Sequence, residues 1–260
     1  MGVTQAPSSE SDYSESAPGT HLRASRLIGS GLAWLIAALL APTIVQWLMG
    51  FLIGFGTGLV GIHLPPTWFK ANAVLFLLVG GIGLQSVLLA GSLRRGRLVG
   101  NRNQAVGLGM NPIDRPFLVT GLVALLLCCQ IGVVELTRHL GVSRRPVHHI
   151  VSEFQLAVLG LELVLFIALA PVAEELFFRG WLWVGLRRVW GTVPVMIVTA
   201  MAWLGLHVFD GLYRPVLLIP FAVLLTIIRY VGCSVRASIA GHVAGNALVF
   251  SWMIIESYGP

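Results

Sequence analysis

The chain alternates long apolar runs with short loops that carry arginines, and this pattern most restricts what it can fold into. Hydrophobic residues make up 56% of the sequence and charged residues only 11%, whereas a soluble domain carries about 25% charged residues. A transmembrane helix needs roughly 20 apolar residues, and several runs reach that length. A spanning barrel would instead show alternating segments of about 10 residues. We therefore predict an all-α polytopic membrane protein, a bundle of about seven or eight transmembrane helices around a buried polar site.

The apolar runs divide the chain into three regions. Residues 1–26 are polar and rich in serine, which indicates a disordered N-terminal tail. N-terminal transmembrane helices are expected within residues 27–136, and a second group of helices within 150–256. The expected spans are 27–49, 71–91, 117–136, 156–186, 193–209, 215–231 and 237–255.

The first apolar run, from Leu27 to about Ile62, is too long for one simple span. It contains Pro42 and a series of glycines. We therefore expect its second part to be a separate glycine-rich helix or re-entrant segment that ends at Pro65-Pro66.

The net charge of +6 comes mostly from arginines in loops, where such residues orient helices rather than bind nucleic acid. If the loop 92–115 is cytoplasmic, alternation also places the N-terminal tail, the Arg187-Arg188 turn and the Arg229–Arg236 turn in the cytoplasm. The positive-inside rule favours this arrangement. We expect an integral multi-pass protein with a cytoplasmic N-terminus and a site that opens toward the cytoplasm.

Three charged residues interrupt one apolar run at 170–180. Ionisable residues there cost about 2.5–3.5 kcal/mol each at the centre of a helix, so they call for a functional hypothesis. On a helix, Glu175 and Arg179 are four residues apart and can pair on one face. Glu174 projects about 100° away and is free for another partner. The alternative is a helix end at the membrane interface, with the charged groups reaching water.

Two other apolar runs each carry a polar pair with a four-residue spacing. Trp203 and His207 form the first pair, and His242 and Asn246 form the second, where Gly245 allows another helix to approach closely. Taken alone, a membrane histidine such as His207 is more often a packing or hydrogen-bonding residue, and the second pair could simply join two helices by hydrogen bonds. Because polar groups in lipid face the bundle interior, we expect the three segments to converge on one buried pocket.

Two further glutamines, Gln85 and Gln130, lie inside other apolar runs. We interpret both as interhelical hydrogen-bonding residues. Three cysteines, Cys128, Cys129 and Cys233, do not make a disulfide framework.

The ordered set of three motifs resembles the CAAX protease and bacteriocin-processing family of intramembrane proteases, also called CPBP or Abi, which includes prenyl-protein endopeptidases. The resemblance covers about residues 155–255. The family's second motif usually has Phe four residues before its histidine; this chain has Trp203 there, which we expect to line the site and contact substrate. The candidate catalytic residues are Glu174, Glu175, Arg179, His207, His242 and Asn246.

The resemblance implies hydrolysis of a peptide bond by an activated water. Glu174 would act as general base and hold the water with His207. His242 and Asn246 would donate hydrogen bonds to the oxyanion that forms. The other two charged residues of the first motif would orient the site or help bind substrate. Substrates would be membrane-anchored or transmembrane polypeptides, with CAAX-type prenylated proteins as one class.

No cofactor is expected, and zinc is the alternative. Two histidines and a glutamate can form a catalytic zinc site, and its ligands here would be Glu174, His207 and His242. The zincin spacing His-Glu-x-x-His is absent. The expected partners are a polypeptide substrate and the lipid bilayer, with no nucleic acid.

Two other functions use the same buried residues differently. The chain could be a non-catalytic membrane scaffold or a bacteriocin-immunity-type protein, in which the polar groups serve assembly. A small transporter could use buried Glu and His as a proton relay, but no repeated pair of broken helices, the feature typical of transporters, is present.

Overall fold

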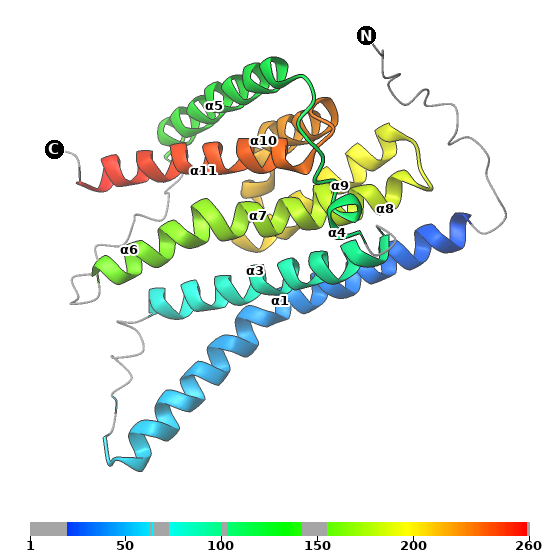
Figure 1. The fold of residues 1–260 in the computed structure, drawn as a ribbon. Coiled ribbons are helices and arrows are strands. Elements are labelled where there is room, and N and C mark those ends of the chain that lie inside the picture. The colour runs from blue at the N-terminus through cyan, green and yellow to red at the C-terminus, as the bar shows by residue number, and fades with distance from the viewer. Residues whose placement is uncertain (1–19, 63, 65–72, 100–102, 142–154, 259–260) are drawn as a thin grey trace, which may run out of the picture.

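A computed structural model describes residues 20–62, 64, 73–99, 103–141 and 155–258, and within these ranges it contains helices and no strands. The all-α prediction is therefore confirmed. Figure 1 shows the helices as one bundle in which the continuous helical run 155–187 passes through the centre. Most of the predicted N-terminal tail, residues 1–19, and the start of the predicted C-terminal region lie outside the described residues.

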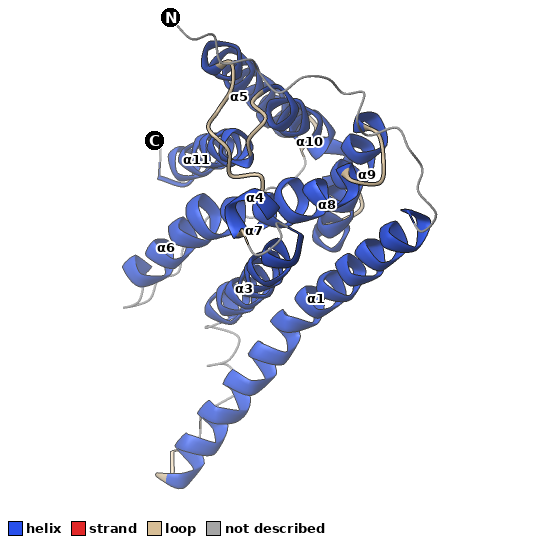
Figure 2. Cartoon of the chain, turned by 45° about the vertical axis from the view of Figure 1, so that its right-hand side comes forward, coloured by secondary structure: helices blue, strands red, loops and turns tan. Residues whose placement is uncertain are grey.

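Helix α1 (Thr20–Leu59) is one uninterrupted helix of 40 residues with Pro42 inside it. The expected break after residue 49 and the separate re-entrant piece are therefore wrong, and the helix begins six residues before the expected end of the tail. It packs against α3 (Ala73–Val99) at least as far as Gln46, whose Nε2 donates to the carbonyl of Phe76 at 3.2 Å. Its last turns diverge from the bundle (Figures 1 and 2). Gly54, Gly56 and Gly58 in those turns meet no atom within 4 Å of an added Cβ among the described residues.

Five helices in the described part of the chain are long and apolar enough to cross a membrane. They lie within α1, α3, α5 (Pro116–His139), α10 (Tyr213–Val231) and α11 (Val235–Tyr258). The run 155–187 and the shorter α9 (Thr192–Leu206) bring the apolar helical segments of the described residues to seven. The exposed apolar side chains on these helices are those that a bilayer would cover.

The central run consists of five consecutive helical pieces with two wide, π-helical segments: α6 (Gln155–Leu163), η2 (Val164–Leu169), α7 (Ala170–Glu175), η3 (Leu176–Leu182) and α8 (Trp183–Arg187). Pro171 lies in the first turn of α7, and its ring has no N–H and clashes with the carbonyl four residues earlier in a regular α-helix. The wider turns of η2 accommodate it without ending the helix. The candidate glutamates thus lie between two π segments, which often occur at functional sites.

Helix α9 ends at Leu206, and a 3-10 turn, η4 (His207–Asp210), follows, so the span expected over 193–209 is shorter than predicted. Fifteen residues extend about 22 Å, less than the roughly 30 Å hydrocarbon core of a bilayer. His207 therefore lies at the end of a helix that stops inside the depth of the bundle.

Residues 103–115, between α3 and α5, pack against the turn between α10 and α11. They include the short helix α4 (Gln104–Gly107). Asp114 N–H donates to the carbonyl of Gly232, and Val235 N–H donates to the carbonyl of Gly109. These two connections therefore lie on the same side of the bundle, as the expected alternation of spans requires.

Candidate active site

Glu174 is buried on α7, and hydrogen-bond donors from two other helices hold both of its carboxylate oxygens. Gln85 Nε2, on α3, donates to Glu174 Oε1 at 2.8 Å. Trp203 Nε1, on α9, donates to Glu174 Oε2 at 2.7 Å. A carboxylate only accepts and has about four lone-pair positions, so these two bonds leave acceptor capacity for a water.

Glu175 lies at the centre of a second buried group. Its Oε1 atom accepts from Arg179 Nη1 at 2.9 Å and lies 3.0 Å from Nδ1 of His242. The expected i,i+4 pairing of Glu175 with Arg179 is therefore present, and both side chains are fully buried. Glu174 faces different partners, as the 100° separation on the helix requires.

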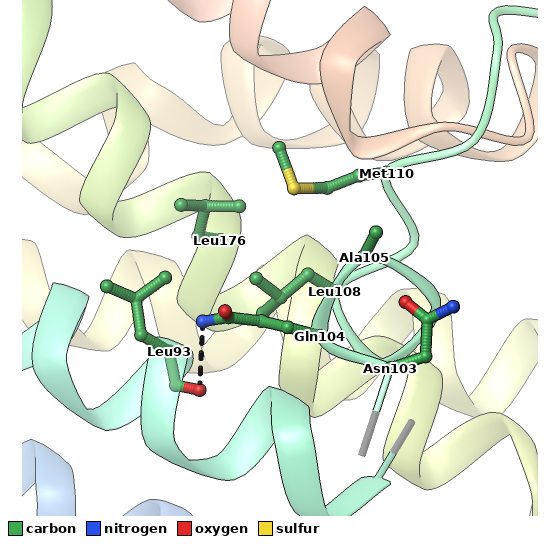
Figure 3. A pocket seen from close by; sticks show the side chains of 7 residues that line it. All are labelled: Leu93, Asn103, Gln104, Ala105, Leu108, Met110 and Leu176. Atoms are coloured by element: carbon green, nitrogen blue, oxygen red, sulfur yellow. Dashed lines mark hydrogen bonds between the residues drawn. The ribbon is translucent and has the colours of Figure 1, made fainter. Parts of the chain in front are cut away.

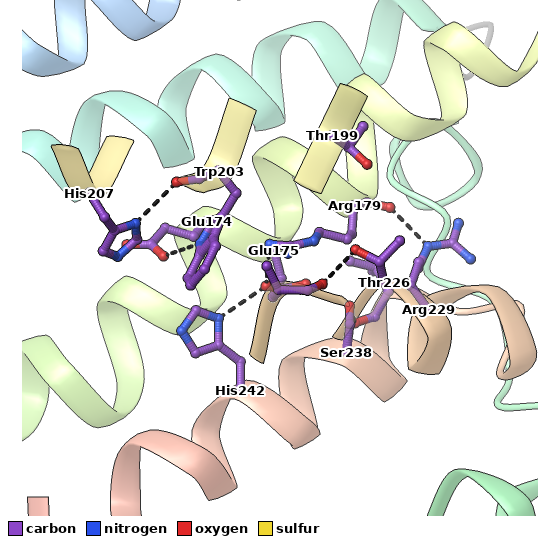
Figure 4. Close-up of polar contacts among 12 residues, drawn as sticks. Glu174, Glu175, Arg179, Thr199, Trp203, His207, Thr226, Arg229, Ser238 and His242 are labelled. Atoms are coloured by element: carbon purple, nitrogen blue, oxygen red, sulfur yellow. Dashed lines mark hydrogen bonds and ion pairs between the residues drawn. The ribbon is translucent and has the colours of Figure 1, made fainter. Parts of the chain in front are cut away.

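His207 reaches this region through Trp203. The Nδ1 atom of His207 lies 3.0 Å from the carbonyl oxygen of Trp203, and the two ring centroids are 4.3 Å apart. The Trp203 ring also lies 5.1 Å from the Arg179 guanidinium and 5.8 Å from the His242 ring. Trp203 therefore connects the three motifs, and Figure 4 shows their side chains converging in the interior.

Asn246 has a bond that the sequence did not predict. Its Nδ2 atom donates to the carbonyl oxygen of Phe166, in η2, at 2.8 Å. The Ala170 N–H bonds the carbonyl of Leu165, so in the same register the Phe166 carbonyl would face the nitrogen of Pro171, which has no hydrogen. Asn246 thus caps a carbonyl left without a backbone donor, one turn along α11 from His242.

Helix α10 closes the site from the other side at Phe221. A Cβ added to Gly245 would clash with the Phe221 ring, so α10 and α11 approach closely at this glycine, as the sequence predicted. The Phe221 ring lies 5.2 Å from the His242 ring, edge to face. His242 is therefore packed by Phe221 as well as held by Glu175.

Two residues in and around the site were underestimated from the sequence. Gln85 was expected only as an interhelical hydrogen bonder, yet its partner is Glu174. Arg229 was counted as a loop arginine, which is wrong: it is buried, its Nε donates to the carbonyl of Arg179 at 2.9 Å, and its guanidinium lies over the Trp183 ring. The signal for both was a polar side chain in or beside an apolar run, but no spacing rule identifies a partner tens of residues away.

The residues of the zinc alternative are not gathered as a preformed ligand group. No group of three His, Cys, Asp or Glu side chains that could hold a metal occurs among the described residues. Nδ1 of His242 lies against Glu175, and Nδ1 of His207 lies against the Trp203 carbonyl. Glu174 is bound by Gln85 and Trp203.

A pocket of about 780 Å³ lies beside the site, between α3, the α4 loop and η3 (Figure 3). Its lining is mostly apolar, and Gln104 at its edge donates to the carbonyl of Leu93. Leu176, one residue after Glu175, is its link to the candidate site. None of the candidate catalytic side chains lines it, so it is separate from the carboxylate site.

Comparison with known proteins gives one family match. Residues 157–248 match the family model described as type II CAAX prenyl endopeptidase Rce1-like. The match contains all three motifs and confirms the resemblance seen in the sequence for this segment. No curated protein and no solved structure matches the chain.

Proposed function

Starting from the Rce1-like match of residues 157–248, we propose that the protein is an intramembrane endopeptidase that uses Glu174 to activate water. The observation that carries the proposal is the pair of adjacent, buried glutamates with separate partners. Glu174 is held by two neutral N–H donors, and Glu175 by Arg179 and His242. One carboxylate is thus available for proton transfer, while the other is committed to an ion pair.

In the proposed reaction, Glu174 takes a proton from a water held between it and His207. The resulting hydroxide attacks the carbonyl carbon of the substrate peptide bond. His242 and Asn246 donate to the oxyanion, and the C–N bond breaks as the proton passes from Glu174 to the leaving nitrogen. Glu175 and Arg179 touch no reacting atom in this scheme; they hold His242 and the adjacent turn in place.

We propose membrane-anchored or transmembrane polypeptides as substrates, with CAAX-type prenylated proteins as the first class to test. The depth of the site within a bundle of apolar helices supports a substrate that reaches the protein from the bilayer. The cytoplasmic opening of the site remains part of this proposal.

The hydrogen bonds and the ion pair that join these polar groups across helices also support a second candidate, a non-catalytic membrane scaffold or immunity-type protein. In that case the same bonds would serve only to hold the helices together. A scaffold should tolerate Glu174→Gln, since an amide still accepts one of the two hydrogen bonds. A peptidase should not, because an amide is not a general base.

The test compares membranes from cells that express the wild type or Glu174→Gln at matched levels, with protein termini mapped by mass spectrometry. Cleavage products that appear only with the wild type would support the peptidase and identify its substrate. Identical termini, together with full rescue of a deletion phenotype by Glu174→Gln, would favour the scaffold.

A further inference from the structure

Glu174 is held from outside its own helix by two donors, one on each oxygen. We propose that Gln85 and Trp203 are positioning residues that together fix this carboxylate, so that α3 completes the site. The inference rests on the proposed role of Glu174 as general base. It extends the functional unit beyond residues 157–248, since Gln85 lies in the N-terminal part of the chain.

The geometry explains why two donors are needed. One hydrogen bond would leave the carboxylate free to rotate about that contact. Gln85 binds Oε1 at 2.8 Å and Trp203 binds Oε2 at 2.7 Å, so both the position and the plane of the group are fixed. A catalytic group must be held to within about 0.5 Å and 10–20° of its productive geometry, and bonds from two separate helices meet that need.

The Gln85 amide is oriented so that its N–H group reaches Glu174 while its oxygen stays unpaired among the described residues. This orientation costs free energy, and the bond to Glu174 explains why it is adopted. The side chain is 7% exposed, and its Oε1 atom is buried without a hydrogen-bond partner in the described part of the structure. An unpaired buried acceptor costs about 1–3 kcal/mol. Rotating the amide by 180° would point that oxygen at the carboxylate and bring two acceptors together. An apolar side chain of the same length would avoid both problems, so packing alone does not explain a glutamine here.

Trp203 contributes through its N–H rather than through its ring alone. It is 1% exposed, and a phenylalanine at this position would keep an aromatic ring but lose the donor to Glu174. Its hydrogen bond with His207 involves only the backbone carbonyl, which accepts from Nδ1 of His207 and which a substitution leaves in place. Trp203→Phe therefore tests the hydrogen bond while keeping the His207 contact.

The chain offers a matched control for each position. Gln130, on α5, is also a buried glutamine and lies outside the candidate site. Trp181, in η3, is fully buried, and its Nε1 atom has no hydrogen-bond partner among the described residues. Trp181→Phe and Gln130→Met thus remove the same groups without touching Glu174.

The experiment uses the full-length protein in lipid vesicles, with a peptide taken from a substrate that terminus mapping identifies. Gln85→Met, Trp203→Phe and the double variant are compared with Gln130→Met and Trp181→Phe. Displacement of a catalytic group by about 1 Å costs roughly 100-fold, so we expect kcat to fall about 10- to 100-fold in each site variant, with KM within about threefold. The double variant should fall to the level of Glu174→Gln and no further, because both residues act through that one group.

A second measurement tests the contacts without turnover. Thermal unfolding is measured for Gln85→Met and Trp203→Phe, each with Glu174 and with Glu174→Leu. We expect each change to lower Tm when Glu174 is present and to have a smaller effect when it is absent. If Gln85→Met fails to fold, Trp203→Phe against Trp181→Phe decides the question.

The outcomes distinguish a failure of the proposed positioning role from a failure of the proposed peptidase activity. Wild-type cleavage with unchanged kcat in both site variants would overturn the positioning role and leave the peptidase standing. A fall in kcat that Gln130→Met and Trp181→Phe share would overturn it as well. Absence of cleavage by the wild type would reject the peptidase itself, and with it the positioning role, whatever the unfolding measurements give.

Discussion

The Nδ1 atom of His242 lies 3.0 Å from Glu175 Oε1 and joins α11 to α7 in the centre of the bundle. As a carboxylate paired with Arg179, Glu175 only accepts, so the imidazole hydrogen is on Nδ1. The Nε2 atom can then donate to an oxyanion only when the ring carries both protons. Glu175 thus fixes the orientation of the His242 ring and the nitrogen that carries its hydrogen, although Glu175 touches no substrate in the proposed reaction.

The first prediction concerns Glu175→Gln, which keeps the shape of the side chain and removes its charge. Arg179 would remain buried without its counterion, and removal of one partner of a buried pair typically costs about 3–5 kcal/mol. We expect a lower Tm of the purified protein and loss of cleavage of at least about 100-fold, since His242 loses its anionic acceptor as well.

Glu135→Gln is the control for that change. Glu135 pairs with Arg138 at 2.9 Å near the end of α5, with side chains that are 32% and 61% exposed. Such pairs contribute about 0–1 kcal/mol. Equal shifts in Tm for the two variants would mean that the buried pair has no special role in stability.

Asn246→Ala distinguishes two roles of Asn246, its bond to the Phe166 carbonyl and its proposed donation to the oxyanion. Loss of the bond to the Phe166 carbonyl should lower the free energy of unfolding by about 0.5–1.5 kcal/mol. Loss of an oxyanion donor should also reduce kcat by about 100- to 1,000-fold. A lower Tm with an unchanged cleavage rate would show that Asn246 only caps the π segment, and His242 would be left as the oxyanion donor.

The sequence was sufficient for features that depend on local spacing and on the cost of polarity in lipid. The four-residue spacing of Glu175 and Arg179 predicted their ion pair. The expectation that buried polar groups face inward predicted that the motifs on α7, α9 and α11 would meet. Both follow from helix geometry and dielectric cost alone, so no knowledge of the tertiary structure was needed.

Features that depend on the packing of distant helices could not be predicted. Gln85 is 89 residues from Glu174, and nothing in its own apolar run distinguishes it from Gln130. Pro171 lies inside the expected span 156–186, and nothing in the sequence shows that wide turns occur on both sides of α7. Pro42, in contrast, indicated a break in α1 that does not occur. A proline signals only a missing donor and a local clash, and neighbouring contacts decide whether the helix bends, widens or ends.

Gly245→Ala should damage the site through Phe221. The added methyl group would clash with Phe221 Cε2 and lie 3.1 Å from Leu126 Cδ2, and a displaced Phe221 ring would disturb His242. Overpacking of this kind costs about 1–3 kcal/mol, so we expect a lower Tm and slower cleavage. Gly132→Ala on α5 is the control, because its methyl group meets nothing within 4 Å; there, replacement of a helical glycine should stabilise by about 0.5–1 kcal/mol. Similar Tm changes for both variants would contradict the close approach of α10 and α11.

The last prediction concerns orientation in the membrane. The loop that contains α4 and the turn after α10 lie together at one end of the bundle. Arg97, Arg115 and Arg236 are exposed near that end, so the positive-inside rule predicts that it faces the cytoplasm. Single cysteines at two exposed positions test this: Val106, in α4, and Leu140, just after α5. In a background that lacks Cys128, Cys129 and Cys233, a membrane-impermeant thiol reagent should label Leu140→Cys in intact cells and Val106→Cys only after permeabilisation. One helix, α5, separates the two positions, so they must label from opposite sides in any orientation, and this requirement checks the assay itself. The reverse labelling pattern would place the arginine-bearing loops and the N-terminal end of α1 outside the cytoplasm, and a substrate cut from the cytoplasmic side would then have to be abandoned.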